Sequence, residues 1–392
     1  MDWSQCYTNL DKCDRSTNLI ALSPNYGFPE PDNSSLVKNG AQDIRALGDA
    51  VDTAVWNVGF GQAAKNKIIN GDFGVNQRAF TTSTADGSFC FDRYKQLAVG
   101  DGTSTFSAQV FTPGAAPIAG YEASNFLRIV TTGQTTSASR TVVTNLIENV
   151  RTFAGQTVTF SFFAKASTGT PNVAVDFSQL FGTGGSATIT GIGTNKLGIT
   201  SSWARYSVTM SIPSISGKTI GAGSSLNVNF WVSAGSDFNA RTNSLGLQSV
   251  TIDTWGWQLE YGSKATPFQL AGGGDPQSEL ALCQRYYYRT TAGNLYSPFA
   301  PGCANGATSG RYVFPFAVTM RVKPTALEYS TLAIAIPGSA VYAVSSLTLE
   351  DATNNAVNLL TANSNSGLSN GAFTVLLSNN STSGYIGVSS EL

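Results

Sequence analysis

The chain has 392 residues, a length typical of two or three domains, and its 23 basic and 24 acidic residues give a formal net charge of -1. It contains no basic run, which argues against a nucleic-acid-binding function, because that function needs clustered Lys and Arg. Only 12% of the residues are charged and 42% are hydrophobic, so the composition predicts a β-rich protein with a sizeable core and a surface of hydroxyl and amide groups.

The N-terminal sequence MDWSQCYTNLDKCDR lacks the basic and apolar regions of a signal peptide, and no apolar run reaches the roughly 20 residues that cross a bilayer. We therefore expect synthesis and assembly in a cytoplasm, without membrane insertion. In that compartment free thiols are favoured, although Cys6 with Cys13 and Cys283 with Cys303 are pairs that could bridge after release.

Residues 1–35 contain several turn formers, including Pro24, Pro29 and Pro31, and too few periodic apolar residues to build a core. Such an arm is usually ordered by a partner. We interpret it as a segment that attaches the chain to another protein; a flexible tail is the alternative.

Residues 36–64 are predicted to form a short helix and a connector, with Ser34 and Ser35 as candidate capping residues. The apolar positions are spaced by three and four residues, which is the heptad pattern of a helix that faces another helix. The helix is weak by itself, because it is short and contains Gly40 and Gly48. We predict a homotrimer in which the seam lies on a threefold axis; packing on the chain's own sandwich is the alternative. The seam residues are Val37, Ile44, Leu47, Val51 and Ala54.

Residues 65–270 show period-two alternation in several segments, for example at 157–163 and 226–232. No helical period lies between them, which predicts an antiparallel β-sandwich. Trp231 is out of phase with the apolar side of its strand, so we expect an outward indole that contacts a ligand or another subunit. In residues 250–261 the apolar phase changes, and a bulge near Thr254 would reconcile it.

A glycine-rich linker at residues 271–277 precedes a second unit, residues 278–392, which we predict to be a smaller β-sandwich. We expect this unit to be distal and receptor-facing. Its turn-rich loops at 305–310 and 363–370 are candidate contact regions, because loops on a rigid scaffold can vary freely.

Three segments carry a resemblance to a known family. Residues 250–289 contain VTIDTWGWQLEYGSKATPFQ and, after the linker, SELALCQRYYYR; residues 67–78 are KIINGDFGVNQR, and residues 91–94 are FDRY. Together they resemble the jelly-roll module of bacteriophage tail-fibre and minor tail proteins, over roughly residues 65–290. Tyr94 stands where the family usually has tryptophan. The resemblance implies a virion structural protein, and it implies that residues 286–288 fix the docking of the two β units.

By this resemblance we expect a tail fibre or receptor-binding protein that adsorbs a phage to host surface glycans. Three copies per fibre would turn weak sugar contacts into durable attachment. The arm would join other tail or baseplate proteins, and the protein would belong to a tail appendage of the virion. The alternative is a structural component without a recognition role, such as a baseplate, collar or head-decoration protein.

Jelly-roll carbohydrate-binding modules often hold a structural calcium ion. By that resemblance Asn70, Asp72 and Asp253 are candidate ligands, but calcium takes six to eight oxygens and the sequence offers only a few. Hydrogen-bonded side chains are therefore the favoured interpretation, and no cofactor is expected.

Catalysis is not expected either. Without histidine, Ser-His-Asp and Cys-His sites are not available, and neither are most zinc sites. A glycosidase needs only two facing carboxylates. The candidate carboxylates are Asp92, Asp101, Asp176, Asp253 and Glu260. They are better explained as structural ion pairs or hydrogen-bonded groups.

Overall fold

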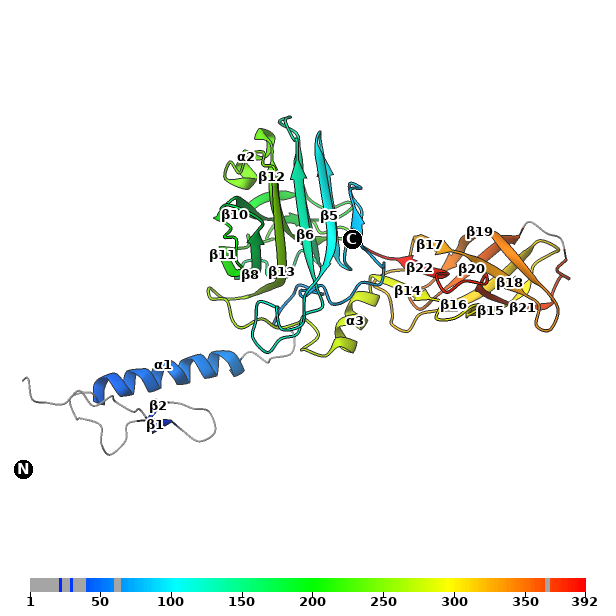
Figure 1. Cartoon of the computed structure of the whole chain (residues 1–392), viewed down its shortest axis with the longest axis horizontal. Helices are drawn as coiled ribbons and strands as arrows, with labels where there is room; N and C mark the ends of the chain where they lie inside the picture. Colours follow the sequence, from blue (N-terminus) through cyan, green and yellow to red (C-terminus); the bar gives the residue numbers. More distant parts are fainter. Residues whose placement is uncertain (1–20, 23–28, 31–39, 60–64, 364–366) are drawn as a thin grey trace, which may run out of the picture. The chain divides into compact units, whose positions relative to one another are not determined.

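The computed structural model describes residues 21–22, 29–30, 40–59, 65–363 and 367–392. The chain divides into two compact units, Met1–Gln62 and Ala63–Leu392 (Figure 1). The two β units that the sequence separates at residues 271–277 therefore belong to one compact body.

The first unit contains strands β1 (Ala21–Leu22) and β2 (Pro29–Glu30), which pair antiparallel, and helix α1 (Gly40–Gly59). The helix occupies the segment where the seam was predicted. Ile44 is 66% exposed and Val51 is 39% exposed, while Leu47 is half-buried. Val37 and the side chain of Ala54 lie outside the described residues. The described part of the seam thus leaves two large apolar side chains uncovered within a single chain.

The second unit begins with two antiparallel sheets. The five-stranded sheet has the order β10-β9-β12-β7-β4, and the six-stranded sheet has the order β11-β8-β13-β6-β5-β3. The strands of the five-stranded sheet are β4 (Tyr94–Val99), β7 (Arg140–Glu148), β9 (Asn172–Leu180), β10 (Ile189–Gly198) and β12 (Ser225–Ala234). Those of the six-stranded sheet are β3 (Thr82–Ser83), β5 (Thr103–Val110), β6 (Asn125–Thr132), β8 (Thr157–Ala166), β11 (Ala204–Ser211) and β13 (Val250–Tyr261).

The alternation in the sequence places large apolar side chains between these sheets. Phe162 of β8 meets Phe230 of β12 with ring centroids 5.1 Å apart, and Trp257 of β13 packs against Phe230 at 5.4 Å. Offset and edge-on aromatic pairs of this kind add to the free energy gained by burial. The predicted all-β sandwich is confirmed.

The segment at residues 67–78, which resembles an opening strand of the family, is a run of turns here. Asn70 and Phe73 have positive φ angles of 62° and 56°. The segment lies against β13, because the Trp257 amide donates to the Gly71 carbonyl at 2.8 Å. A Cβ atom at residue 71 would lie 2.3 Å from the Trp257 carbonyl oxygen, so this close approach requires glycine.

The bulge in β13 lies just beyond the predicted position. The register shifts between Trp255 and Gln258, and Gly256 has a φ of 65°, which favours glycine. The bulge turns the two tryptophans to opposite sides of the strand. Trp257 packs in the sandwich core, whereas Trp255 contacts Phe111, Tyr121, Phe163 and Phe268 under the loops that cover the six-stranded sheet.

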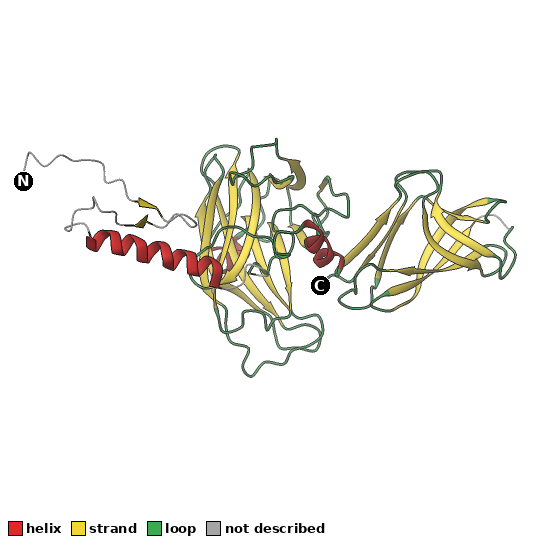
Figure 2. Ribbon diagram, turned by 90° about the horizontal axis from the view of Figure 1, so that it is seen from below, coloured by secondary structure: helices red, strands yellow, loops and turns green. Residues whose placement is uncertain are grey.

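The C-terminal part is a closed barrel with a small accessory sheet, where the sequence predicts a second sandwich (Figure 2). The barrel order is β15-β16-β20-β19-β18-β21, and the accessory sheet is β14-β22-β17. The predicted strand at 327–336 is split at Thr331, where φ is 51°, so its two halves join different sheets. The elements are α3 (Pro276–Gln284), β14 (Tyr287–Thr291), β15 (Pro298–Ala304), β16 (Ser309–Pro315), β17 (Ala326–Ser330), β18 (Leu332–Ala335), β19 (Val341–Ala352), β20 (Ala356–Asn363), β21 (Phe373–Ser378) and β22 (Tyr385–Ser389).

A buried cluster of charged and aromatic side chains joins the sandwich to the C-terminal part. The Arg93 guanidinium lies 3.5 Å from the ring centroid of Tyr286 and pairs with Glu391. Arg78 lies 3.6 Å from the ring centroid of Tyr287, and it also pairs with Asp92 at 3.6 Å. We call these residues, Arg78, Asp92, Arg93, Tyr286, Tyr287 and Glu391, the junction cluster.

Asp92 therefore has the structural ion-pair role that the sequence interpretation assigned to it. Burial raises the pKa of Asp92 to about 6, and the Arg78 guanidinium opposes that increase.

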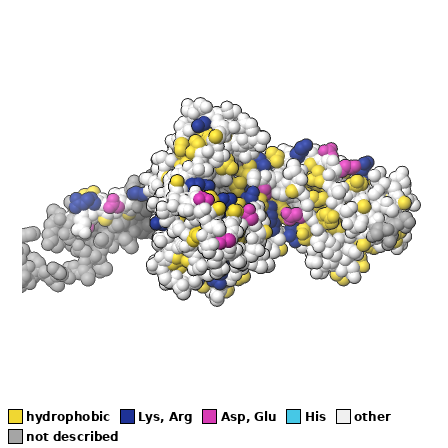
Figure 3. Space-filling view, turned by 90° about the horizontal axis from the view of Figure 1, so that it is seen from above, with side chains coloured by type: hydrophobic (Ala, Val, Ile, Leu, Met, Phe, Trp, Pro, Cys, Tyr) yellow, Lys and Arg dark blue, Asp and Glu magenta, His cyan; other side chains and the backbone are white. Residues whose placement is uncertain are grey.

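The described surface agrees with the composition. On the face shown in Figure 3, charged side chains form small mixed groups among uncharged polar atoms. None of the described helices combines the length and apolar character that a membrane span requires. Cys90, Cys283 and Cys303 are free thiols, so the Cys283–Cys303 bridge is not formed; Cys6 and Cys13 lie outside the described residues.

Candidate functional site

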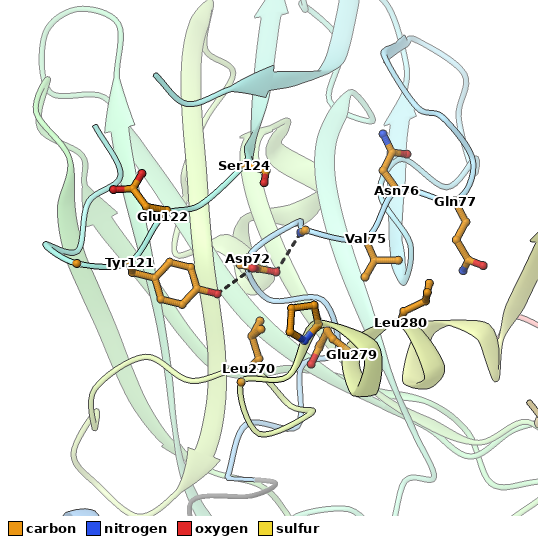
Figure 4. A pocket seen from close by; sticks show the side chains of 14 residues that line it. Asp72, Val75, Asn76, Gln77, Tyr121, Glu122, Ser124, Leu270, Glu279 and Leu280 are labelled. Atoms are coloured by element: carbon orange, nitrogen blue, oxygen red, sulfur yellow. Dashed lines mark hydrogen bonds between the residues drawn. The ribbon is translucent and has the colours of Figure 1, made fainter. Parts of the chain in front are cut away.

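The candidate site is an open groove of about 650 Å³ at the end of the sandwich next to α3 (Figure 4). Three segments line it: the turns after residue 70, the loop before β6, and the linker with the start of α3. Its lining residues are Asp72, Gly74, Val75, Asn76, Gln77, Gly120, Tyr121, Glu122, Ser124, Leu270, Gly274, Pro276, Glu279 and Leu280.

Trp255 holds the first two walls of the groove in place. Its indole Nε1 donates to the Asp72 carbonyl at 3.1 Å, and its ring meets the Tyr121 ring edge-on at 5.4 Å. The Tyr121 hydroxyl in turn donates to Asp72 Oδ2 at 2.9 Å, the contact drawn in Figure 4. The bulge at Gly256 therefore positions the groove, because it turns Trp255 toward these loops.

Glu279 holds the third wall. Its carboxylate accepts hydrogen bonds from the backbone amides of Asn70 and Gly272, which ties α3 and the linker to the first turn. The helix itself begins at Pro276, and the Asp275 side chain caps it by accepting from the amides of Gln277 and Ser278. The groove is thus built by packing and hydrogen bonds on all three sides.

Burial sets the electrostatics of the groove. It raises the pKa of Asp72, although the hydrogen bonds from Gly74 and Tyr121 oppose the shift. Burial also raises the pKa of Glu279, against the amides of Asn70 and Gly272. The pKa of Tyr121 is raised by burial and by the neighbouring Asp72 carboxylate, so its hydroxyl stays a hydrogen-bond donor. Among the residues that the structure describes, no lysine or arginine lines the groove.

The groove offers a tyrosine ring, carboxylates, side-chain amides and apolar contacts from Leu270 and Leu280. Gln77 is anchored below the groove: its Nε2 donates to Asp92 Oδ1 and to the Tyr287 carbonyl, and its Oε1 is buried without a hydrogen-bond partner. A buried acceptor without a partner is unfavourable unless a ligand or water satisfies it. This arrangement suits a neutral or cationic ligand that is rich in hydrogen-bond donors.

The three candidate calcium ligands are engaged in other contacts. Asn70 bonds within its own turn and to the Asp92 carbonyl, and Asp72 bonds to Tyr121 and Gly74. Asp253 forms a two-pronged ion pair with Arg128 at 2.8 and 3.0 Å. Among the residues that the structure describes, no group of three or more His, Cys, Asp or Glu side chains could hold a metal ion.

The sequence predicts an outward Trp231 indole that contacts a ligand or another subunit, but the indole is only 2% exposed and is covered by the chain itself. The prediction that Trp231 points away from the apolar side of its strand is correct, since it packs outside the main core with Val142, Ala174 and Leu245. The connection after β12, with the short helices η4 (Ser236–Phe238) and α2 (Asn239–Thr242), covers it. The indole donates to Asp176 at 2.7 Å, and Arg241 pairs with the same carboxylate at 2.9 Å.

The remaining carboxylates from the sequence interpretation also have structural partners. Asp101 accepts hydrogen bonds from Thr135, Thr136 and Ser139, which lowers its pKa, and Glu260 accepts from Thr266. Neither residue lines the groove. Of the residues singled out in the sequence, Asp72 alone lies in the groove. Tyr121 and Glu122 were missed, because they sit in a loop without a periodic pattern. Glu279 was missed although it lies in the quoted segment SELALCQRYYYR, because no local signal gives a carboxylate in that segment a role in a site.

No family model matches the chain, and no curated protein matches its sequence. Solved structures of carbohydrate-binding modules are similar to part of it. One, described as "CBM4 structure and function", shares 16% identity at a TM-score of 0.28 and covers 50% of this chain and 99% of its own. A family 11 module from Clostridium thermocellum, in complex with a mixed-linked β-1,3-1,4 tetrasaccharide, shares 11% at a TM-score of 0.27, covering 48% and 99%.

A xylan-binding domain of the CBM22-1 type from Paenibacillus barcinonensis shares 12% identity at a TM-score of 0.26 and covers 52% of this chain and 98% of its own. Since these TM-scores are below 0.5, we base the functional argument on the residues of this chain.

Proposed function

We propose that this chain binds glycans, and that the groove between Tyr121 and α3 is the binding site. The observation that carries the proposal is an open cavity of about 650 Å³ in which an aromatic ring, carboxylates, amides and apolar side chains converge. Sites with a few placed polar groups on a partly apolar wall are typical of small-ligand recognition. Sugars present both hydroxyl donors and apolar ring faces, which fits this lining.

Ser124 allows a direct test, because its exposed side chain lies on the groove and makes no side-chain hydrogen bond in the described structure. We expect Ser124→Trp to weaken binding at least about tenfold, which is 1.4 kcal/mol, since the indole would fill the groove. Binding would first be found on a glycan array and then measured by titration calorimetry.

The matched control is Ser216→Trp, which adds the same indole at an exposed serine outside the groove. Equal loss in both variants, or full binding by Ser124→Trp, would place the site elsewhere. An intact chain that binds no glycan on the array would remove the proposed function.

We further propose that the protein acts as a trimeric tail fibre or receptor-binding protein of a phage. The resemblance of residues 67–78, 91–94 and 250–289 to tail-fibre proteins supports this role, and so does the α1 seam, where Ile44 and Val51 are left exposed. Most of the stability of a helix in a protein comes from packing of its apolar face, which favours a partner for this seam. Burial of three seams against one another would also supply the avidity that weak sugar contacts need.

The trimer is tested by light scattering. The full chain should have three times its monomer mass of 41.1 kDa, and the triple change Ile44→Ser, Leu47→Ser, Val51→Ser should lower that mass. Gln42→Ser with Arg45→Ser is the matched control, because both side chains are exposed and polar. A monomeric wild-type chain at micromolar concentration would rule the trimer out.

One observation favours the second candidate, a packing component of the virion. The barrel carries exposed apolar side chains on adjacent strands: Phe373 is 59% exposed, Val313 is 55% exposed, and the exposed Cys303 pairs in register with Phe373. Such a surface can be covered by a neighbouring subunit. Gold-labelled antibody against residues 275–392 distinguishes the two roles: label at free tail tips supports adhesion, and label on the head or collar supports packing.

A further inference from the structure

The charge of the groove bears on which glycans it can accept. Asp72, Glu122 and Glu279 line it, and none of the described lining residues is basic. Arg78 directly follows the turn segment that forms one wall of the groove. Its guanidinium belongs to the junction cluster, where it stacks on Tyr287 and pairs with Asp92 and Glu391. Hydrogen-bond donors contact these carboxyl groups, but no cationic side chain among the described lining residues does.

Asp72 has acceptor capacity to spare. Its Oδ1 accepts from the Gly74 amide at 3.0 Å and its Oδ2 from the Tyr121 hydroxyl at 2.9 Å, whereas a carboxylate offers about four lone-pair positions. Glu122 is exposed and follows Tyr121 directly, on the same wall of the groove (Figure 4). A ligand cation between these carboxylates could also lie against the tyrosine ring.

We infer that the groove selects glycans that carry a free ammonium group, such as de-N-acetylated amino sugars, and rejects glycans that carry carboxylate or phosphate. The inference rests on the proposed function, because it specifies the ligand class of the same site. Charge-assisted hydrogen bonds to an ammonium are stronger than those to a neutral hydroxyl. An anionic sugar would instead face like charges across the groove, which is unfavourable. N-acetylation removes the positive charge at almost the same position, so it provides the sharpest comparison.

The test is titration calorimetry of the full chain with four tetrasaccharides: β-1,4-linked glucosamine, N-acetylglucosamine, glucose and α-1,4-linked galacturonate. We expect the glucosamine tetramer to bind about tenfold more tightly than the two neutral tetramers at low ionic strength, and the galacturonate tetramer not to bind. The preference should shrink at about 0.15 M salt, because the interaction is electrostatic and the groove is open.

Glu122→Gln is the variant of choice. The amide oxygen can still accept the hydrogen bond from the Gly114 amide, so the loop should keep its structure. We expect the preference for glucosamine over the neutral tetramers to fall about threefold. Asp237→Asn is the control, because it removes the same charge from an exposed side chain on η4, outside the groove.

The outcomes separate the inference from the proposed function. Equal binding of glucosamine and neutral tetramers, tighter binding of galacturonate, or the same loss of preference in Asp237→Asn would overturn the charge selection but leave a glycan-binding groove. If the neutral tetramers bind the wild type and Ser124→Trp equally, the groove is not the glycan-binding site. If no glycan on the array binds the full chain, both the inference and the proposed function are wrong.

Discussion

Replacing Arg93 with alanine should lower the free energy of unfolding by about 3–5 kcal/mol, the usual loss when one partner of a buried ion pair is removed. Arg93 is 1% exposed, stacks on Tyr286, and pairs with Glu391 near the end of the chain. Its guanidinium also donates to the Leu146 carbonyl. The variant would leave the Glu391 carboxylate at the junction with only Arg78, at 3.6 Å, as its cation.

We expect this change to act on the joint between the sandwich and the C-terminal part. Denaturant unfolding gives the loss of stability, and small-angle scattering should show a wider distribution of sizes if the joint loosens. Arg311→Ala is the control, because the Arg311–Glu350 pair is half exposed, and such pairs contribute about 0–1 kcal/mol.

A double-mutant cycle sharpens the result. Glu391→Gln should cost less in the Arg93→Ala background than in the wild type, because the buried carboxylate is then already poorly paired. Additive losses would contradict the pairing at the junction, and a loss below about 1 kcal/mol for Arg93→Ala would mean that the joint is held by other contacts.

Replacing Trp257 with alanine should destabilise the sandwich by about 3–5 kcal/mol. Its side chain is fully buried, and its ring lies 5.2 Å from Tyr94, 5.3 Å from Phe160 and 5.4 Å from Phe230, so the change leaves a cavity between the two sheets. Its indole also donates to Thr254 Oγ1 at 2.8 Å, and that bond is lost as well.

The measurement is equilibrium unfolding followed by far-UV circular dichroism. Val110→Ala serves as the control, because Val110 is 78% exposed and substitutions at such positions usually change stability by less than about 0.5 kcal/mol. Trp257→Phe should lose less than Trp257→Ala, since the phenyl ring refills part of the cavity. Similar losses for Val110→Ala and Trp257→Ala would contradict the core position.

Much of the fold is readable in the sequence, because strand alternation and helical spacing are local patterns. Phe160, Phe162 and Phe230 alternate with polar residues, and the structure buries them between the sheets. The α1 seam is likewise visible as a heptad pattern, and the low charge of the chain predicts the polar, weakly charged surface. The Asp–Arg contact at Asp92 could also be anticipated, because a buried carboxylate needs a partner.

What lies over each face of a sheet depends on segments far away in the chain. The outward phase of Trp231 is a local property, but its burial depends on the later connection that places Phe238 and Arg241 over it. The same limit applies to the C-terminal part. Alternation alone cannot distinguish a closed barrel from a sandwich, because closure depends on which strand pairs with which.

The groove shows most clearly which features local sequence patterns predict and which depend on long-range packing. The sequence by itself identifies β13, its tryptophans and a change of phase near Thr254. Only the tertiary structure shows that the bulge at Gly256 turns Trp255 to the other side of β13 from Trp257, and that Trp255 then positions Tyr121 and the Asp72 turn. These residues are up to 183 positions apart, and no local pattern encodes contacts over that separation. The periodic spacing of apolar residues in the sequence predicts the core, whereas the site is created by long-range packing.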